Sequence, residues 1–294
     1  MLDYKLLEAL ARVLEEGGFE RAAQALCITQ SAVSQRIKLL ESQVGQVLLV
    51  RSTPPRATVA GLGLLKHYRQ VACLEADLES ALLPQGPEGF RTLKVGLNAD
   101  SLITWFPGAV KNFLLSGKVL LDLFTDDQDV THRLLQDGEV MGCITSRDKG
   151  LQGCRIHPLG SMRYRMLASP AYMKRWLPQG VSGLKDFGGP VLIFNRKDRL
   201  QDRFFSAVLG FFPSPPLHYV PSATSFQTFA LLGLGCGMIP DLQSRDLRCS
   251  GALVEVVPDM PMDVPLYWHC WDLDSALLTT FTDMLVREAG KCLL

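Results

Sequence analysis

The chain has 294 residues, 47% of them hydrophobic, so it is long enough for two or three domains with ordinary cores. Its formal net charge of +0 excludes a polyelectrolyte and confines any nucleic-acid contact to a local patch. The eight cysteines form no CxxC pair or metal-like spacing, and no apolar run approaches the roughly 18 residues of a membrane span. Without an N-terminal apolar leader, these features predict a cytoplasmic protein with reduced thiols and no metal site.

Three helical patterns open the chain. An apolar stripe over residues 6–14 ends at a glycine pair, and "ERAAQAL" forms a second helix of about two turns. A third helix follows Thr29, which is its expected N-cap. At about 100° per residue, its apolar side chains fall on one side and must face a core. These core positions are Val33, Ile37, Leu40 and Val44.

The opposite side of the third helix carries Ser31, Gln35, Lys38 and Ser42, with Ser34 at its edge; we call these five residues the reading face. A solvated helix face usually carries Glu/Lys pairs, whereas the N-terminal half of this one has no acid. Short side chains let a helix enter a groove, and Gln can bond bidentately to an adenine edge. Two short helices joined by a tight turn are the geometry that presents the second to the major groove. An ordinary polar face is the alternative interpretation.

Basic residues are concentrated near this helix. Residues 30–70 contain six Lys or Arg and one acid, which suits phosphate contact at one end of a neutral chain. After the third helix, "QVLLVRSTPPRAT" predicts a strand, a proline-stiffened tip and a returning strand. Arg51 and Arg56 flank the tip, where arginine can meet the DNA backbone or a narrow minor groove. A solvated β-hairpin is the alternative.

The segment "FERAAQALCITQSAVSQRIKLLESQVGQVLLVRSTPPRATVAGLGLL" resembles the winged helix-turn-helix of LysR-type transcriptional regulators. The pattern AA..L..TQ.AVS..I..LE...G..L..R......T..G..LL runs from Ala22 to Leu65. "CITQSAVSQRIK" and "LLVR..PPR.T" are similar to the ArgP/LysG branch, which controls export of basic amino acids. The resemblance implies a homo-oligomer, a dimer or a dimer of dimers, that binds double-stranded DNA and contacts RNA polymerase.

Residues 61–83 are expected to form one long helix. Leu64, Val71 and Leu78 recur every seventh residue, as in a short helix pair. A buried intramolecular helix is the alternative, but the resemblance implies dimerisation here. The domain limits expected are 1–60 for the DNA-binding domain and 61–88 for the linker helix and hinge, with "PQGPEG" at its end.

Residues 89–294 alternate strands and helices, the pattern of an α/β domain with a parallel sheet. Strands are expected at "TLKVGL", "VLLDLF" and "VMGCIT" around helices at 101–115 and near Leu134. The second block starts with a strand at "RYRMLAS" and includes a helix near 204–209. The resemblance implies a two-lobed, periplasmic-binding-protein-like effector domain. Lobe I would comprise 89–161 and 268–294, and lobe II 162–267.

Ligands of open α/β sheets lie beyond the carboxyl ends of the strands. "GLNADSL" brings Asn98, Asp100 and Ser101 to such a position. Ser101 with nearby N–H groups can hold a carboxylate, and Asp100 can meet an ammonium group. Capping of the helix by Asp100 or Ser101 is the alternative. Comparable positions after other strands or before a helix are those of Thr145, Asn195 and Ser222.

An acidic loop holds Asp126, Asp127 and Asp129, which can attract a basic side chain but are more simply solvated. The glycine pattern "GLGCGM" is not a dinucleotide-binding motif, because it follows an expected helix and precedes an expected strand, the reverse of that fingerprint. No GxSxG, P-loop or HExxH is present, so we expect no enzyme, no catalytic residue and no cofactor.

The leading hypothesis is therefore a sequence-specific regulator of transcription, switched by a small amino acid. Ser31, Ser34 and Gln35 would read bases. The resemblance suggests lysine or arginine as effector and an amino acid exporter gene as target. An architectural or replication-origin DNA-binding protein without a metabolite switch is the second hypothesis. The residues expected to position the phosphates are Gln30, Lys38, Arg51 and Arg56.

Overall fold

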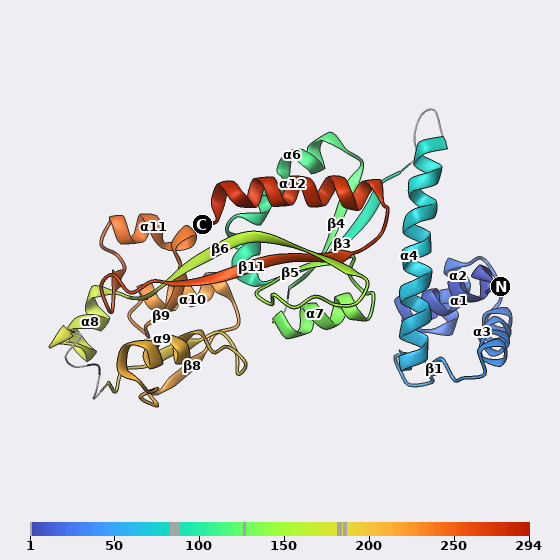
Figure 1. Ribbon diagram of the computed structural model, residues 1–294. Coiled ribbons are helices and arrows are strands. Elements are labelled where there is room, and N and C mark those ends of the chain that lie inside the picture. Colours follow the sequence, from blue (N-terminus) through green and yellow to red (C-terminus); the bar gives the residue numbers. More distant parts are fainter. Residues whose placement is uncertain (1, 83–88, 126–127, 181–183, 185–186) are drawn as a thin grey trace.

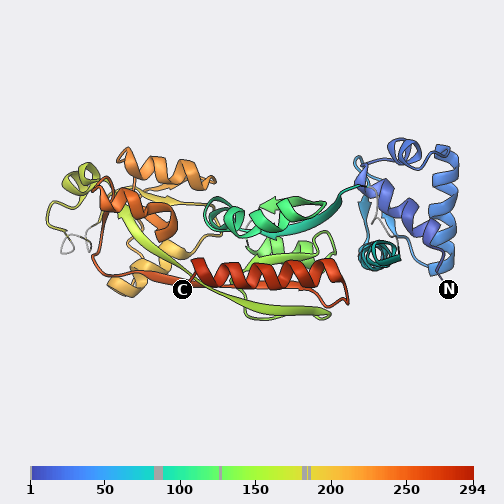
Figure 2. The same cartoon turned by 90° about the horizontal axis from the view of Figure 1, so that it is seen from above.

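The computed structural model describes residues 2–82, 89–125, 128–180, 184 and 187–294. A helical N-terminal unit, a central α/β lobe and a distal α/β lobe follow one another along the long axis (Figures 1 and 2). We call the two lobes lobe I and lobe II. Among the helices described, none has both the length and the apolar character needed to cross a lipid bilayer.

The N-terminal unit has three helices and a two-stranded antiparallel wing. Thr29 caps the third helix by accepting a hydrogen bond from the Ala32 N–H at 3.2 Å, as expected. The side chains predicted to face the core from this helix are buried, except that Val44 is only partly buried. The elements are α1 (Tyr4–Glu15), α2 (Phe19–Ala25), α3 (Gln30–Val44), β1 (Leu49–Val50) and β2 (Arg56–Ala57).

The linker helix α4 (Val59–Leu82) is fastened to the wing at its first turn. The Thr58 hydroxyl donates to the Val47 carbonyl at 2.8 Å and accepts from the Gly61 N–H at 3.1 Å. A Cβ on Gly61 would lie 2.1 Å from the Leu48 carbonyl oxygen, so only glycine fits this contact. The wing and α4 therefore pack backbone against backbone.

Further along, α4 joins the N-terminal unit to lobe I. The Arg69 guanidinium donates to the Gly138 carbonyl at 3.0 Å and lies 3.3 Å from the Glu15 carboxylate. The Cys73 thiol lies 3.5 Å from the Ser275 hydroxyl, which belongs to lobe I. Arg69, which lies on α4, thus contacts both α1 and lobe I.

Lobe I is built on parallel strands with helices on both faces (Figure 1). The β3 strand lies between β4 and β5. In the core, Trp268 packs against Phe281 of the last helix. The elements are β3 (Arg91–Leu97), α5 (Ala99–Ile103), α6 (Phe106–Ser116), β4 (Val119–Thr125), α7 (Gln128–Gln136), β5 (Gly142–Thr145) and α12 (Ala276–Cys292).

Lobe II surrounds the far ends of the two long strands β6 (Cys154–Ala168) and β11 (Met262–Trp271). These antiparallel strands run through both lobes. The other elements are α8 (Pro170–Trp176), β7 (Val191–Ile193), α9 (Leu200–Leu209), β8 (Leu217–Tyr219), α10 (Ala223–Leu231), β9 (Gly237–Pro240), α11 (Asp241–Cys249) and β10 (Val254–Glu255).

Several expectations for residues 89–294 were wrong in detail. The single helix expected at 101–115 is two, α5 and α6, because Pro107 stands in the first turn of α6 and cannot occupy a helix interior. The strand expected to begin at Arg163 begins at Cys154, and α9 begins at Leu200. The helices α8 and α11 were not predicted. Most of "PQGPEG", together with Asp126 and Asp127, lies outside the described residues.

Candidate DNA-binding surface and effector cavity

The reading face of α3 lies open to solvent. Ser31, Gln35 and Lys38 are exposed and Ser34 is partly buried. The only acid of α3, Glu41, uses its carboxylate to accept the Leu48 N–H at 2.9 Å and so serves the wing. The exposed face therefore offers hydroxyl, amide and ammonium groups without an opposing carboxylate. Gln30, at the first turn of α3, is exposed as well.

The wing belongs to the same N-terminal unit as α3 and presents its two arginines to solvent. Arg51 and Arg56 are both exposed, and the Arg51 guanidinium lies 5.9 Å from the centre of the Phe19 ring. The β1–β2 register pairs Val50 with Arg56, so both cations leave the same short ribbon. Thus the structure brings all seven predicted DNA-contact residues to two neighbouring elements; their contact with DNA stays a prediction.

A cavity of about 330 Å³ lies between the lobes. Lobe I, the long strands β6 and β11, and lobe II all contribute to its wall, so its shape depends on the angle between the lobes. Of the six predicted effector contacts, Asn98, Asp100 and Asn195 line it. Other polar lining residues are Ser146, Tyr164, Lys197, Asp198, Arg199, Gln201, Arg203 and Gln243.

Asp100 provides the acidic group that lobe I contributes to the cavity. The Tyr164 hydroxyl donates to its carboxylate at 2.7 Å. Burial raises the pKa of Asp100 to about 6, the Tyr164 hydrogen bond opposes this shift, and nearby Asp198 adds to it. The carboxyl therefore holds its proton more tightly than an exposed aspartate, and a cation in the cavity would favour its ionised form.

Asp198 organises the loop that lobe II brings to the cavity. Its carboxylate accepts the Phe194 N–H at 3.1 Å and the Leu200 N–H at 2.9 Å. Burial raises the pKa of Asp198, although these hydrogen bonds oppose the shift. The Asn195 side-chain oxygen accepts the Lys197 N–H at 2.8 Å. The oxygen of Asn195 is thus already used to shape this loop.

Two amide oxygens of the cavity wall are buried without a hydrogen-bond partner among the described residues: Oε1 of Gln201 and Oδ1 of Asn98. The Gln201 side chain also bonds to Asp198, and because a carboxylate only accepts, Gln201 must use its NH₂ group there. This fixes Oε1 as the free end. Both oxygens lie behind the cavity surface in residues that line it, and a buried carbonyl oxygen left unpaired costs free energy.

Three of the predicted effector contacts do not line the cavity, although each adjoins a lining residue in the chain. Ser101 is fully buried and accepts a hydrogen bond from the Trp105 indole at 3.1 Å. Thr145 is 1% exposed, and its hydroxyl accepts the Arg147 N–H. Ser222 caps α10 by accepting the Ser225 N–H at 3.3 Å. Each hydroxyl serves the fold at a strand end or helix start, and contact of these three residues with an effector stays a prediction.

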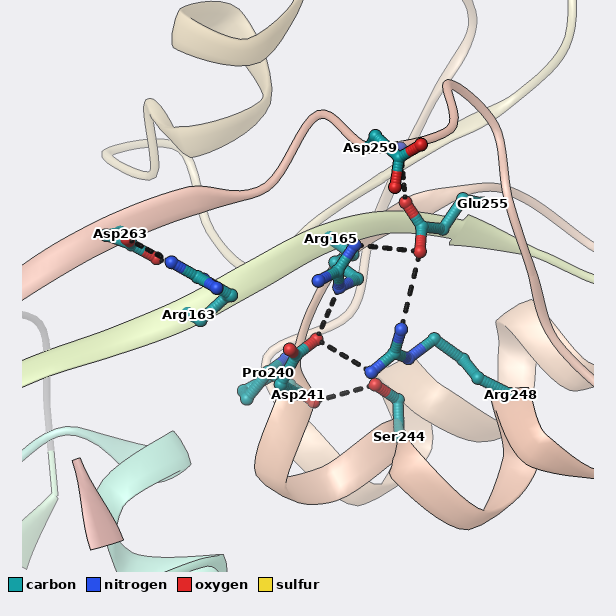
Figure 3. Close-up of polar contacts among 9 residues, drawn as sticks. All are labelled: Arg163, Arg165, Pro240, Asp241, Ser244, Arg248, Glu255, Asp259 and Asp263. Atoms are coloured by element: carbon teal, nitrogen blue, oxygen red, sulfur yellow. Dashed lines mark hydrogen bonds and ion pairs between the residues drawn. The ribbon is translucent and has the colours of Figure 1, made fainter. Parts of the chain in front are cut away.

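Four charges on lobe II secure the wall formed by α11 (Figure 3). Arg165 of β6 reaches Asp241 at 2.9 Å and Glu255 at 2.8 Å, and Arg248 of α11 lies 3.3 Å from each of the same carboxylates. Charges alternate around this partly buried ring, so each cation faces two anions. Because α11 starts directly after Pro240, a lining residue, the ring fixes that part of the wall.

The sequence reasoning missed Tyr164, Asp198 and Gln201. No local signal identified them: Tyr164 lies inside a long strand, and the other two lie in a loop and the first turn of α9. The nearest available signal was "NRKDR", a polar run directly after the apolar strand "PVLIF". Such a run is typical of a strand end that faces a crevice.

Comparison with known proteins agrees with this architecture. Residues 4–62 match the family described as bacterial regulatory helix-turn-helix protein, lysR family, and residues 86–290 match the LysR substrate binding domain. The chain is 46% identical over 294 residues to the HTH-type transcriptional regulator ArgP of Pseudomonas fluorescens (strain Pf0-1), covering 100% of this chain and 99% of the relative. It is 42% identical over 290 residues to the regulator LysG of Mycobacterium tuberculosis (strain ATCC 25618 / H37Rv), covering 99% and 94%.

Two solved structures are similar over nearly their whole length. ArgP from Mycobacterium tuberculosis has a TM-score of 0.89 at 42% identity, covering 99% of this chain and 98% of that one. Full-length LysG from Corynebacterium glutamicum with bound effector Arg has a TM-score of 0.79 at 34% identity, covering 99% of each chain. On these matches, the chain belongs to the LysR family of transcriptional regulators.

Proposed function

We propose that this chain is a sequence-specific transcriptional regulator that binds double-stranded DNA through α3 and the wing. The observation that carries this proposal is the exposed reading face, with its single nearby acid engaged by the wing backbone. Ser31, Ser34 and Gln35 meet base edges in the major groove. Gln30, Lys38, Arg51 and Arg56 contact phosphates and set the orientation.

The effector of this regulator is a basic amino acid, lysine or arginine. The LysG relative with bound Arg supports this assignment, as does the Asp100 carboxyl group among the lining residues. The side-chain cation of the ligand meets the Asp100 carboxylate, to which it donates N–H bonds. Its carboxylate faces the basic lining residues Lys197 and Arg203.

The regulator acts as a homo-oligomer. On α4, Leu78 is 59% exposed and Leu82 is 71% exposed, which leaves an apolar stripe for a second copy. Two copies present two reading helices to a palindromic site. Closing of the lobes on the effector then changes the geometry of the assembled DNA-binding units, and with it the contact with RNA polymerase at an amino acid exporter gene.

Two measurements on the purified chain test the proposal. Calorimetric titration with arginine and lysine should give saturable heat, whereas citrulline and norleucine, which lack the side-chain cation, should give none at the same concentrations. Footprinting on the promoter of an amino acid exporter gene from the same genome should show a protected palindrome whose pattern changes with the effector. A footprint with no response to any amino acid would instead support an architectural DNA-binding protein.

A further inference from the structure

The strands β6 and β11, which connect the lobes, share a short stretch in which they pair with no third strand among the described residues. On the lobe I side, β11 pairs with β5 through residues 267–270. On the lobe II side, β6 pairs with β9 and β10 through residues 164–168. Between these stretches the register slips by one residue, since Leu266 faces Gly160 but Tyr267 faces Pro158. Bending between the lobes is easiest here, because fewest neighbouring strands resist it.

The residues after α12 lie against this stretch. The Leu294 N–H donates to the Ser161 carbonyl at 3.0 Å, and the Ser161 N–H donates to the Leu294 carbonyl at 2.9 Å. Pro265, opposite Ser161 on β11, has no N–H group to offer. Leu293 is 9% exposed and packs in the main core, whereas the Leu294 side chain is 65% exposed. Leu294 is therefore held by its backbone rather than by its side chain.

Gly160 makes room for this contact. Its φ of +118° belongs to a region that L side chains rarely adopt. A Cβ at this position would lie 2.8 Å from both the Leu293 Cβ and the Leu294 carbonyl oxygen. The glycine thus satisfies two separate demands, the backbone bend at the slip in register and the close approach of residues 293–294.

We propose that residues 293–294 form a strap that ties lobe I to the connecting strand β6 and restrains closing of the lobes. The strap begins in α12, which packs on lobe I, and ends on Ser161, directly where β6 leaves that lobe. Ser161 moves with lobe I while both hydrogen bonds last. Bending of β6 at Ser161 must therefore break the strap, and this restraint raises the apparent Kd for any ligand whose closure bends β6 there.

Leu294→Pro tests the strap, because it removes the N–H donor while the exposed side chain contributes little. Leu294→Ala is the matched control, which keeps both backbone bonds. Loss of a hydrogen bond of ordinary strength should lower the Kd for arginine and for lysine by the same factor, about three- to tenfold. The effector-free affinity for DNA should stay the same. Gly160→Ala, which displaces the strap from the other side, should reproduce the effect.

Hydrogen–deuterium exchange separates this inference from the proposed function, on which its ligand assay rests. In Leu294→Pro, amides of residues 159–163 should exchange at least about tenfold faster than in Leu294→Ala, with or without effector. If the native chain binds neither amino acid, the proposed function fails, and the exchange rates alone decide on the strap. Unchanged exchange in residues 159–163 would overturn the strap. So would a Kd that is unchanged, raised, or altered differently for the two amino acids.

Discussion

The reading face and the effector cavity are built in opposite ways. The reading face and wing are convex and come from residues 30–56, on neighbouring elements that pack on one small core. The cavity is concave, and its lining residues extend from Asn98 to Val264 across both lobes. Substitutions on the reading face should therefore act separately, whereas those in the cavity act on a site whose geometry depends on the angle between the lobes.

The largest effect is expected from Asp100→Asn, which removes the charge from the acceptor groups of the cavity. Truncating one partner of a buried charged pair costs about 2–5 kcal/mol, so arginine should bind at least about 30-fold more weakly. Titration calorimetry measures this loss. Asp122→Asn is the control, because Asp122 lies on β4, pairs with Lys94 and is not among the lining residues. Equal losses in both variants would show that Asp100 does not contact the effector.

Gln35→Ala should weaken binding to the operator by about 1–3 kcal/mol and leave random duplex nearly unaffected. The reason is that a base-edge contact is lost while phosphate contacts remain. Competition gel-shift assays with both duplexes give the ratio of the affinity for operator to the affinity for random duplex. Gln43→Ala, at an exposed position in the last turn of α3, should leave this ratio unchanged. A loss of the same size on both duplexes would contradict base reading by Gln35.

The pH dependence of effector binding tests whether Asp100 ionises to meet the cation. Its pKa is raised to about 6, so below that pH the ligand must displace a proton. The affinity for arginine should fall by up to about tenfold for each pH unit below 6 and be nearly constant above 7. Titrations between pH 5 and 8 measure this slope. Asp100→Asn should flatten it, and a profile that stays steep in that variant would assign the proton to another group.

Arg51→Ala should give the smallest effect, and the least selective one. A lost phosphate contact weakens binding to operator and random duplex alike and lowers the slope of log K against log salt by about one. Binding measured at several salt concentrations gives the slope. Arg12→Ala provides the comparison, since Arg12 lies on α1 and pairs with Glu15. A sequence-dependent loss in Arg51→Ala would move this arginine from phosphate contact to base or minor-groove reading.

The same contrast explains what could be predicted from the sequence. The N-cap at Thr29, the buried positions Val33, Ile37 and Leu40, and the paired strands of the wing are all confirmed, because helical periodicity and capping act over a few residues. Helix α12, with Ser275 as its N-cap, follows the same local rules.

The cavity depended on contacts that no local pattern records. Pro158 and Gly160 usually interrupt a strand, yet β6 continues through both because it bridges the two lobes. Ser101 stands one residue after Asp100 but turns inward, where the Trp105 indole needs an acceptor. Strand ends could therefore be located from the sequence, whereas the direction of each side chain around them depends on the tertiary core.

The contact between Gly61 and the Leu48 carbonyl has a mechanical consequence. The wing and α4 are in direct backbone contact here, so a rotation of α4 also rotates the wing. In an assembly joined along α4, the spacing and tilt of the paired DNA-binding heads then follow directly from the crossing angle of two such helices. A small rotation of α4 imposed by lobe I near Arg69 would therefore rotate the DNA-binding unit as well.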